Sequence, residues 1–97
     1  MVTEMPSELD VMKMSIFMKV LSDSSRVKIL FSIKDMAKSV GEIEKDVNMS
    51  QSAVSHQLAL LRKIDMVKTY REGNKIYYSI DERVVNVLEV VKKNAFN

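Results

Sequence analysis

Apolar residues recur at helical spacing over most of the chain and alternate with polar ones only near residues 66–80. The first helical segment follows Ser7, whose spacing from Asp10 is typical of a capping box, and it runs to about Leu21. Its apolar residues cover more than one face, so both sides of this helix need a covering surface. In so small a chain, we expect another subunit to supply the second surface.

A second helix is predicted to begin at either Asp23 or Ser24, because both residue types cap helices well. The helical pattern then breaks near residues 37–39. The expected inward positions of this helix are apolar: Val27, Leu30, Phe31 and Ile33.

Two short helices with a tight polar turn between them are predicted next. Ser39 and Glu42 have capping-box spacing, and the helix that they open ends just before Asn48, a residue that tolerates the left-handed conformation. Ser50 caps the following helix, which is predicted over residues 51–64. Helices joined in this way make a helix-turn-helix candidate.

The second helix of this pair has two very different faces. One face is expected to join the core: Ala53, Val54, Gln57, Leu58, Leu60, Leu61 and Ile64. The other is small, polar and finally basic: Gln51, Ser52, Ser55, His56, Ala59, Arg62 and Lys63. A merely solvated helix face usually carries long Glu and Lys side chains, whereas compact serines and a histidine let a helix approach the edges of DNA bases closely.

One β-hairpin is predicted, with strands over residues 66–71 and 75–80. Gly73 and Asn74 lie between the strands and supply the positive φ angles that a tight turn needs. The last helix, predicted over residues 81–94, is rich in valine and again apolar on two sides, so packing must stabilise it.

Ninety-seven residues fit one domain. The predicted elements make it mainly α with a small β-hairpin wing, a winged helix-turn-helix over residues 7–97 after a tail at residues 1–6. Cysteine is absent, histidine occurs once, and glycine and proline total three, which excludes disulfides, thiolate metal sites and Gly-rich phosphate loops. An enzyme is therefore not expected. No apolar run can cross a bilayer and no signal sequence opens the chain, so we expect a soluble, cytoplasmic protein without a membrane partner.

The net charge of +2 alone says little about binding partners, but the charged residues are unevenly distributed along the chain. The segment from Ser50 to Ile80 carries five basic and two acidic side chains, a net charge of +3, and the rest of the chain sums to −1. Such a basic segment is typical of nucleic-acid binding, although a solvated lysine-rich surface gives the same count.

Three ordered motifs resemble those of ArsR/SmtB transcriptional repressors, over roughly residues 9–94. The opening motif is Leu21-Ser22-Asp23-Ser24-Ser25-Arg26-Val27-Lys28-Ile29-Leu30. The signature of the recognition helix is Met49-Ser50-Gln51-Ser52-Ala53-Val54-Ser55-His56-Gln57-Leu58. The wing motif is Arg71-Glu72-Gly73-Asn74-Lys75-Ile76-Tyr77-Tyr78-Ser79. Three motifs at compatible spacing are far more specific than a lone helix-turn-helix.

The resemblance implies a homodimeric cytoplasmic repressor that an inducer releases from a palindromic DNA operator; the inducer itself is not identified by the sequence. Members of the family pair their first and last helices, which are the two helices that the pattern makes apolar on both sides. The corresponding interface residues here are Leu9, Met12, Ile16, Val84, Val87, Leu88 and Val91.

We expect the second helix of the helix-turn-helix to read DNA in the major groove. The residues facing base edges are Gln51, Ser52, Ser55 and His56, since Gln can hold adenine by two hydrogen bonds while Ser and neutral His each offer a donor or acceptor. The residues expected to hold the DNA backbone are Ser50, Arg62, Lys63, Lys68, Arg71 and Lys75. The alternative is a winged-helix protein-interaction module without specific DNA binding.

The familiar metal sites of the family lack their ligands in this sequence. The start of the helix preceding the turn, residues 39–43, has no cysteine. The last helix offers Asp81, Glu82 and Glu89, but Val84 and Ala95 stand where metal-sensing members carry histidines. Carboxylates alone bind borderline transition metals poorly, so no metal or other cofactor is expected.

Overall fold

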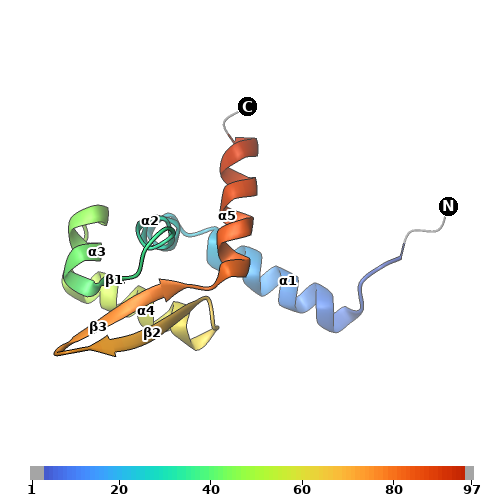
Figure 1. The fold of residues 1–97 in the computed structure, drawn as a ribbon. Coiled ribbons are helices and arrows are strands. Elements are labelled where there is room, and N and C mark those ends of the chain that lie inside the picture. The colour runs from blue at the N-terminus through green and yellow to red at the C-terminus, as the bar shows by residue number, and fades with distance from the viewer. Residues whose placement is uncertain (1–3, 96–97) are drawn as a thin grey trace.

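The structure, a computed structural model, describes residues 4–95 and has the predicted winged helix-turn-helix architecture (Figure 1). The ends of the predicted tail and domain, residues 1–3 and 96–97, lie outside the described part. The elements follow in the order α1 (Glu8–Leu21), α2 (Ser24–Ser32), β1 (Lys38–Ser39), α3 (Val40–Val47), α4 (Gln51–Lys63), β2 (Val67–Glu72), β3 (Lys75–Ile80) and α5 (Glu82–Ala95).

Local capping sets where the helices begin. The Ser7 hydroxyl accepts a hydrogen bond from the Asp10 amide at the start of α1. Of the two predicted caps of α2, Asp23 is the one used, because its carboxylate accepts from the amides of Ser25 and Arg26 at 2.8 and 3.2 Å. The helix starts predicted from these signals agree with the structure to within one residue, but α2 ends at Ser32, before the predicted break near residues 37–39.

The turn of the helix-turn-helix also forms as its sequence predicts. Ser39 and Glu42 make the reciprocal capping box, with each side chain bonded to the other's backbone amide. Asn48 ends α3 in the left-handed conformation, at φ 54° and ψ 51°. Ser50 then caps α4 through a 3.2 Å bond from the Ala53 amide.

The sheet has a strand that the sequence did not predict. The strand order is β1-β3-β2, and the two-residue β1 pairs Lys38 with Tyr78 and Ser39 with Tyr77. Between β2 and β3 the turn is tighter than predicted because Glu72 still pairs in the ladder. Gly73 has a positive φ of 62°, whereas Asn74 does not, which corrects the expectation for Asn74 and matches a turn with glycine at its first central position.

One core lies between the helices and the sheet. Its fully covered members include Ile29, Leu30 and Ile33 of the α2 region, Ile43 of α3, Val54, Leu58 and Leu61 of α4, and Val84 of α5. Leu30 and Ile33 are buried as predicted, whereas Val27 and Phe31 are only half-buried, and the buried Ile29 was not among the predicted inward residues. Leu60 and Ile64 were also predicted to join the core, and they are instead 37 and 38 % exposed.

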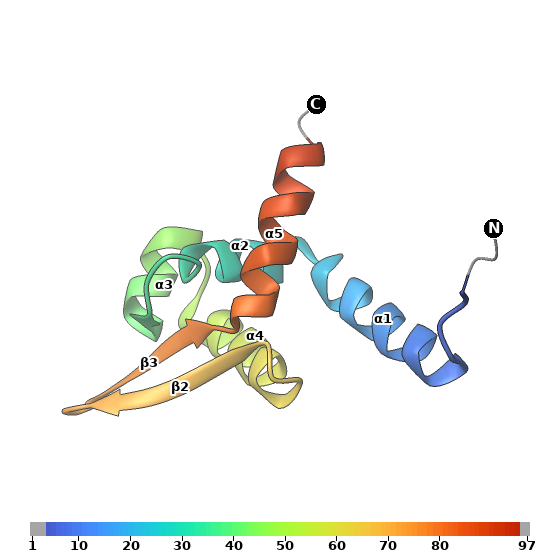
Figure 2. The same ribbon diagram turned by 45° about the vertical axis from the view of Figure 1, so that its right-hand side comes forward.

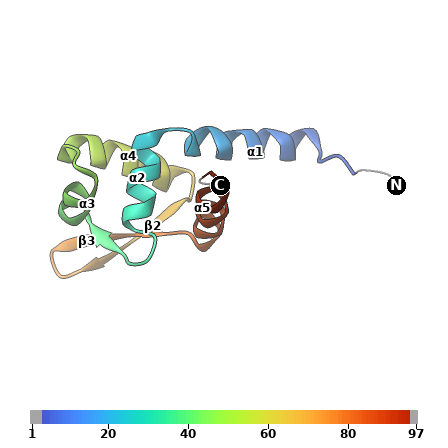
Figure 3. The same ribbon diagram turned by 90° about the horizontal axis from the view of Figure 1, so that it is seen from above.

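Helix α1 extends away from the rest of the molecule, as Figure 3 shows from above. None of its residues is buried, and only its last part packs partly against the core, through Phe17, Val20 and Leu21. Among the described residues, no helix is both long and apolar enough to span a membrane.

Candidate nucleic-acid interface

Helix α4 presents one buried and one exposed face, as its sequence predicts. Val54, Leu58 and Leu61 are fully covered by the core. The four residues predicted to read bases, Gln51, Ser52, Ser55 and His56, are all exposed along the opposite face. Helix α4 and the β2–β3 hairpin occupy the same lower part of the molecule in Figures 1 and 2.

Exposed basic side chains continue from α4 onto the hairpin. Arg62 and Lys63 end α4, and the wing adds further cations. Every predicted backbone contact is exposed: Ser50, Arg62, Lys63, Lys68, Arg71 and Lys75. At the tip of the wing the Arg71 Nε donates a 3.3 Å hydrogen bond to the Gly73 carbonyl, which holds the guanidinium beside the turn. Exposed cations at the end of a helix and on a neighbouring hairpin are suited to contacts with phosphate groups.

The wing also carries an aromatic pair that sequence reasoning did not single out. Tyr70 and Tyr77 are directly opposite in the β2–β3 ladder, and their rings stack with centroids 5.4 Å apart. Aromatic cross-strand pairs stabilise hairpins, and their opposite positions could have been found by counting outward from the turn at Gly73.

A side-chain hydrogen bond links α2 to α4. Arg26 on α2 donates a 2.9 Å hydrogen bond from Nε to Oε1 of Gln57, a polar residue on the inward side of α4. Sequence reasoning placed Gln57 on the core face without a partner. A polar residue in an otherwise apolar stripe was the signal for such a contact.

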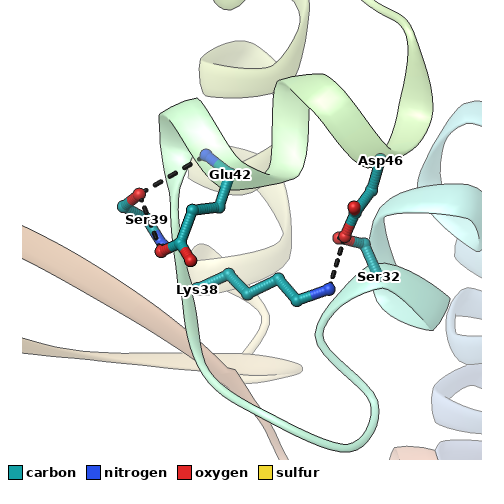
Figure 4. A network of polar contacts seen from close by, with 5 residues as sticks. All are labelled: Ser32, Lys38, Ser39, Glu42 and Asp46. Carbon is teal, nitrogen blue, oxygen red and sulfur yellow. Dashed lines mark hydrogen bonds and ion pairs between the residues drawn. The ribbon is translucent and has the colours of Figure 1, made fainter.

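A polar network braces α3, the other helix of the motif (Figure 4). Lys38 from β1 and Ser32 from α2 both donate to the Asp46 carboxylate. The bond from Lys38, followed by that from Ser32, lowers the pKa of Asp46 below its usual range. In the capping box, the amide and hydroxyl of Ser39 lower the pKa of Glu42 in the same way.

Asp81 and Glu89, two of the three acidic residues singled out at the last helix, interact with cations of the protein itself. Asp81 accepts from the backbone amide and Nε of Arg83, both at 2.9 Å, and these bonds lower its pKa. Glu89 pairs with Lys34 at 2.6 Å, and this bond raises the pKa of Lys34. Within residues 4–95, no three His, Cys, Asp or Glu side chains gather as a metal-binding group.

The residues predicted to form a dimer interface divide into two groups. Leu9, Met12, Ile16 and Val91 are 54, 55, 50 and 55 % exposed, and Val87 is half-buried. Val84 and Leu88 are 0 and 3 % exposed and belong to the core of a single protomer. The prediction was wrong for these two, because both apolar sides of α5 look alike in the sequence and these residues face inward.

Comparison with known proteins gives consistent matches. The family of bacterial regulatory proteins of the arsR type matches residues 23–69. The transcriptional repressor SdpR of Bacillus subtilis is 34 % identical over 67 residues, which cover 69 % of this chain and 74 % of SdpR. The transcriptional regulator KmtR of Mycobacterium tuberculosis is 35 % identical over 72 residues, or 74 % of this chain. The match spans only 55 % of the length of KmtR.

The fold has close solved counterparts. The structure of HlyU from Vibrio cholerae superimposes with a TM-score of 0.84 at 28 % identity, covering 94 % of this chain and 100 % of that one. HlyU is described as a transcriptional activator, so the sign of regulation differs among the relatives.

Proposed function

The chain belongs to the arsR family of bacterial regulatory proteins, and from this premise we propose that it is a sequence-specific DNA-binding transcription regulator. The exposed face of α4 carries the proposal. The side chains of Ser52, Ser55 and His56 are small or flat polar groups, and the opposite face of their helix is buried in the core. A helix of this kind can enter the major groove and bring hydrogen-bonding groups to base edges.

The roles in DNA binding follow from position. Gln51, Ser52, Ser55 and His56 read bases, while the cations of α4 and the wing hold phosphates and set the register. The hydroxyl of Ser50 accepts from the Ala53 amide, and its proton can be donated to a phosphate.

We further propose that the regulator is a cytoplasmic homodimer. The support is the extended α1, whose apolar residues Leu9, Met12 and Ile16 are 54, 55 and 50 % exposed within the described chain. Two copies related by a two-fold axis read a palindromic operator, with half-sites about one helical turn (~34 Å) or a multiple apart. In this proposal, DNA binding represses transcription, and an inducer relieves the repression. SdpR, one of the relatives, is named as a transcriptional repressor.

The test is selection of bound sequences from random DNA, followed by titration of the selected site at several salt concentrations. We expect a palindrome and a log–log salt dependence with a slope of about −0.9 per phosphate contact. Dialysis against EDTA is expected to leave the affinity unchanged, because no metal takes part in the proposal. Equal affinity for the selected and random DNA would reject the proposal in favour of a protein-interaction module.

A further inference from the structure

An apolar cleft of about 390 Å³ lies between α2 and α5, beside the end of α1. Its walls are formed by Val27 and Phe31 of α2 and by Leu88 and Val91 of α5, and Leu21 of α1 contributes from the side. Figure 2 shows α5 standing beside α2 at this point. The volume lies in the range of small-molecule sites, which are mostly apolar with few polar groups.

One cation stands at the edge of this cleft. Lys92 lines the cleft from α5, and its Nζ lies 5.9 Å from the centre of the Phe31 ring on α2, so the side chain reaches across the opening. Glu89, one turn earlier on α5, is paired with Lys34. Among the described residues, no carboxylate forms an ion pair with Lys92.

We propose that this cleft binds an apolar organic acid, with its hydrocarbon part between α2 and α5 and its carboxylate at Lys92. The inference rests on the proposed function and gives the inducer a chemical class. Charge complementarity favours this occupant, because an anionic head group pairs with the ammonium while the apolar walls exclude water from the tail.

The cleft is connected to the DNA-reading helix through α2. Val27 lines the cleft, and its neighbour Arg26 holds Gln57 of α4 by the 2.9 Å hydrogen bond. A ligand that separates α2 from α5 shifts the anchor of α4. Coupling of this kind is reciprocal, so DNA must weaken ligand binding by the same factor as the ligand weakens DNA binding.

The binding test titrates the full chain with dodecanoate below its micelle-forming concentration and, separately, with dodecan-1-ol as the uncharged probe. Calorimetry measures both affinities. We expect Lys92→Met to weaken dodecanoate binding at least threefold and to leave dodecanol binding unchanged. The matched control is Lys93→Met, which removes a neighbouring charge that does not line the cleft. Equal dodecanoate affinities of the two variants, or no binding by the unmodified protein, would overturn the proposal.

A second variant fills the cleft itself. Ala95 lines it from the exposed last turn of α5, so Ala95→Phe adds bulk without disturbing the core. We expect this variant to bind neither probe and to keep its oligomeric state. Unchanged probe binding together with loss of self-association would show that a second copy of the chain occupies the cleft, and would overturn the proposal.

The effector role is tested on the selected DNA site. Saturating dodecanoate is expected to weaken DNA binding at least tenfold in the unmodified protein, and much less in Ala95→Phe and Gln57→Ala. Specific DNA binding without a dodecanoate response overturns this inference and leaves the proposed function intact. Dodecanoate binding by a protein that has no DNA preference rejects the proposed function instead.

Discussion

The guanidinium of Arg26 on α2 and the amide of Gln57 on α4 are joined by a 2.9 Å hydrogen bond across thirty-one positions of sequence. Both side chains are partly buried. Among the described residues, this is the one side-chain hydrogen bond between α2 and α4, and it lies on the side of α4 opposite to the exposed serines and histidine.

Gln57→Ala is expected to lower the free energy of unfolding by about 1–2 kcal/mol, because the partly buried Arg26 guanidinium loses its acceptor. Urea denaturation measures the change. Arg62→Ala, a truncation at an exposed position of the same helix, should stay within about 0.5 kcal/mol of the unmodified protein. A double-mutant cycle with Arg26→Ala that shows no coupling energy would contradict the assigned contact.

Substitutions on the exposed face of α4 and on the wing should have different effects on DNA binding. Ser55→Ala or His56→Ala should each cost about 1–3 kcal/mol and relax the choice of sequence, because a base contact is lost. Arg71→Ala should weaken binding to all DNA alike and reduce the salt slope by about 1. Fluorescence anisotropy on the selected site and on random DNA separates the two patterns; unchanged operator affinity of both α4 variants would refute the assignment.

Asp46 should make stability depend on acid pH. Its pKa is lowered in the folded protein, so its ion pair with Lys38 stabilises the fold above the ordinary carboxyl range and is lost as the pH falls below about 4. The unmodified protein is therefore expected to be more stable than Asp46→Asn at pH 7, with a difference that shrinks toward pH 2. Thermal melts at several pH values measure this difference. Glu44→Gln, which removes a carboxylate of the same helix without an ion pair in the described structure, should show no such trend.

The two glycines should respond to alanine with opposite signs. Gly41 lies within α3 with open space around its α-carbon, so Gly41→Ala is expected to stabilise the protein by about 0.5–1 kcal/mol. Gly73 has a φ of 62°, and Gly73→Ala should destabilise it by about 1–2 kcal/mol because a side chain disfavours that conformation. Chemical denaturation of both variants tests the pair; the same sign of change in both would contradict the backbone assignment.

Self-association should depend on α1. Met12→Glu places a charge on an exposed apolar face and is expected to weaken dimer formation at least tenfold, since an unpaired charge is costly to bury. Met36→Glu makes the same change at a similarly exposed position outside the helices and should have no effect. Sedimentation velocity at several concentrations distinguishes the two outcomes. Equal dimer affinities would exclude α1 from the interface.

The features predicted well from sequence are those determined within a few residues of the chain. Ser39 with Glu42 and the left-handed Asn48 set the limits of α3 by local hydrogen bonds and backbone preference. The reading face of α4 follows from the helical period. The predicted DNA contacts themselves stay predictions, although the structure leaves all of them exposed.

The features that sequence missed depend on distant partners. Strand β1 forms because Ser39 pairs with Tyr77, a residue far from it in the sequence. Helical periodicity gives the angle between apolar positions but not which of them a neighbouring element covers, so Leu60 was placed in the core although it is 37 % exposed. Periodicity also does not show which apolar side of α5 faces the core, so Leu88 was assigned to the dimer interface although it is buried in the core of one protomer.

Ser39 is a member of two elements at once, as the partner of Tyr77 in the sheet and as the cap of α3. Hinge motion of the wing against the helix-turn-helix would have to break either a strand pair or the capping box. We therefore expect the wing and the helix-turn-helix to move together. A ligand that moves α2 against α5 would then change the distance and angle between the two DNA-reading parts of a dimer.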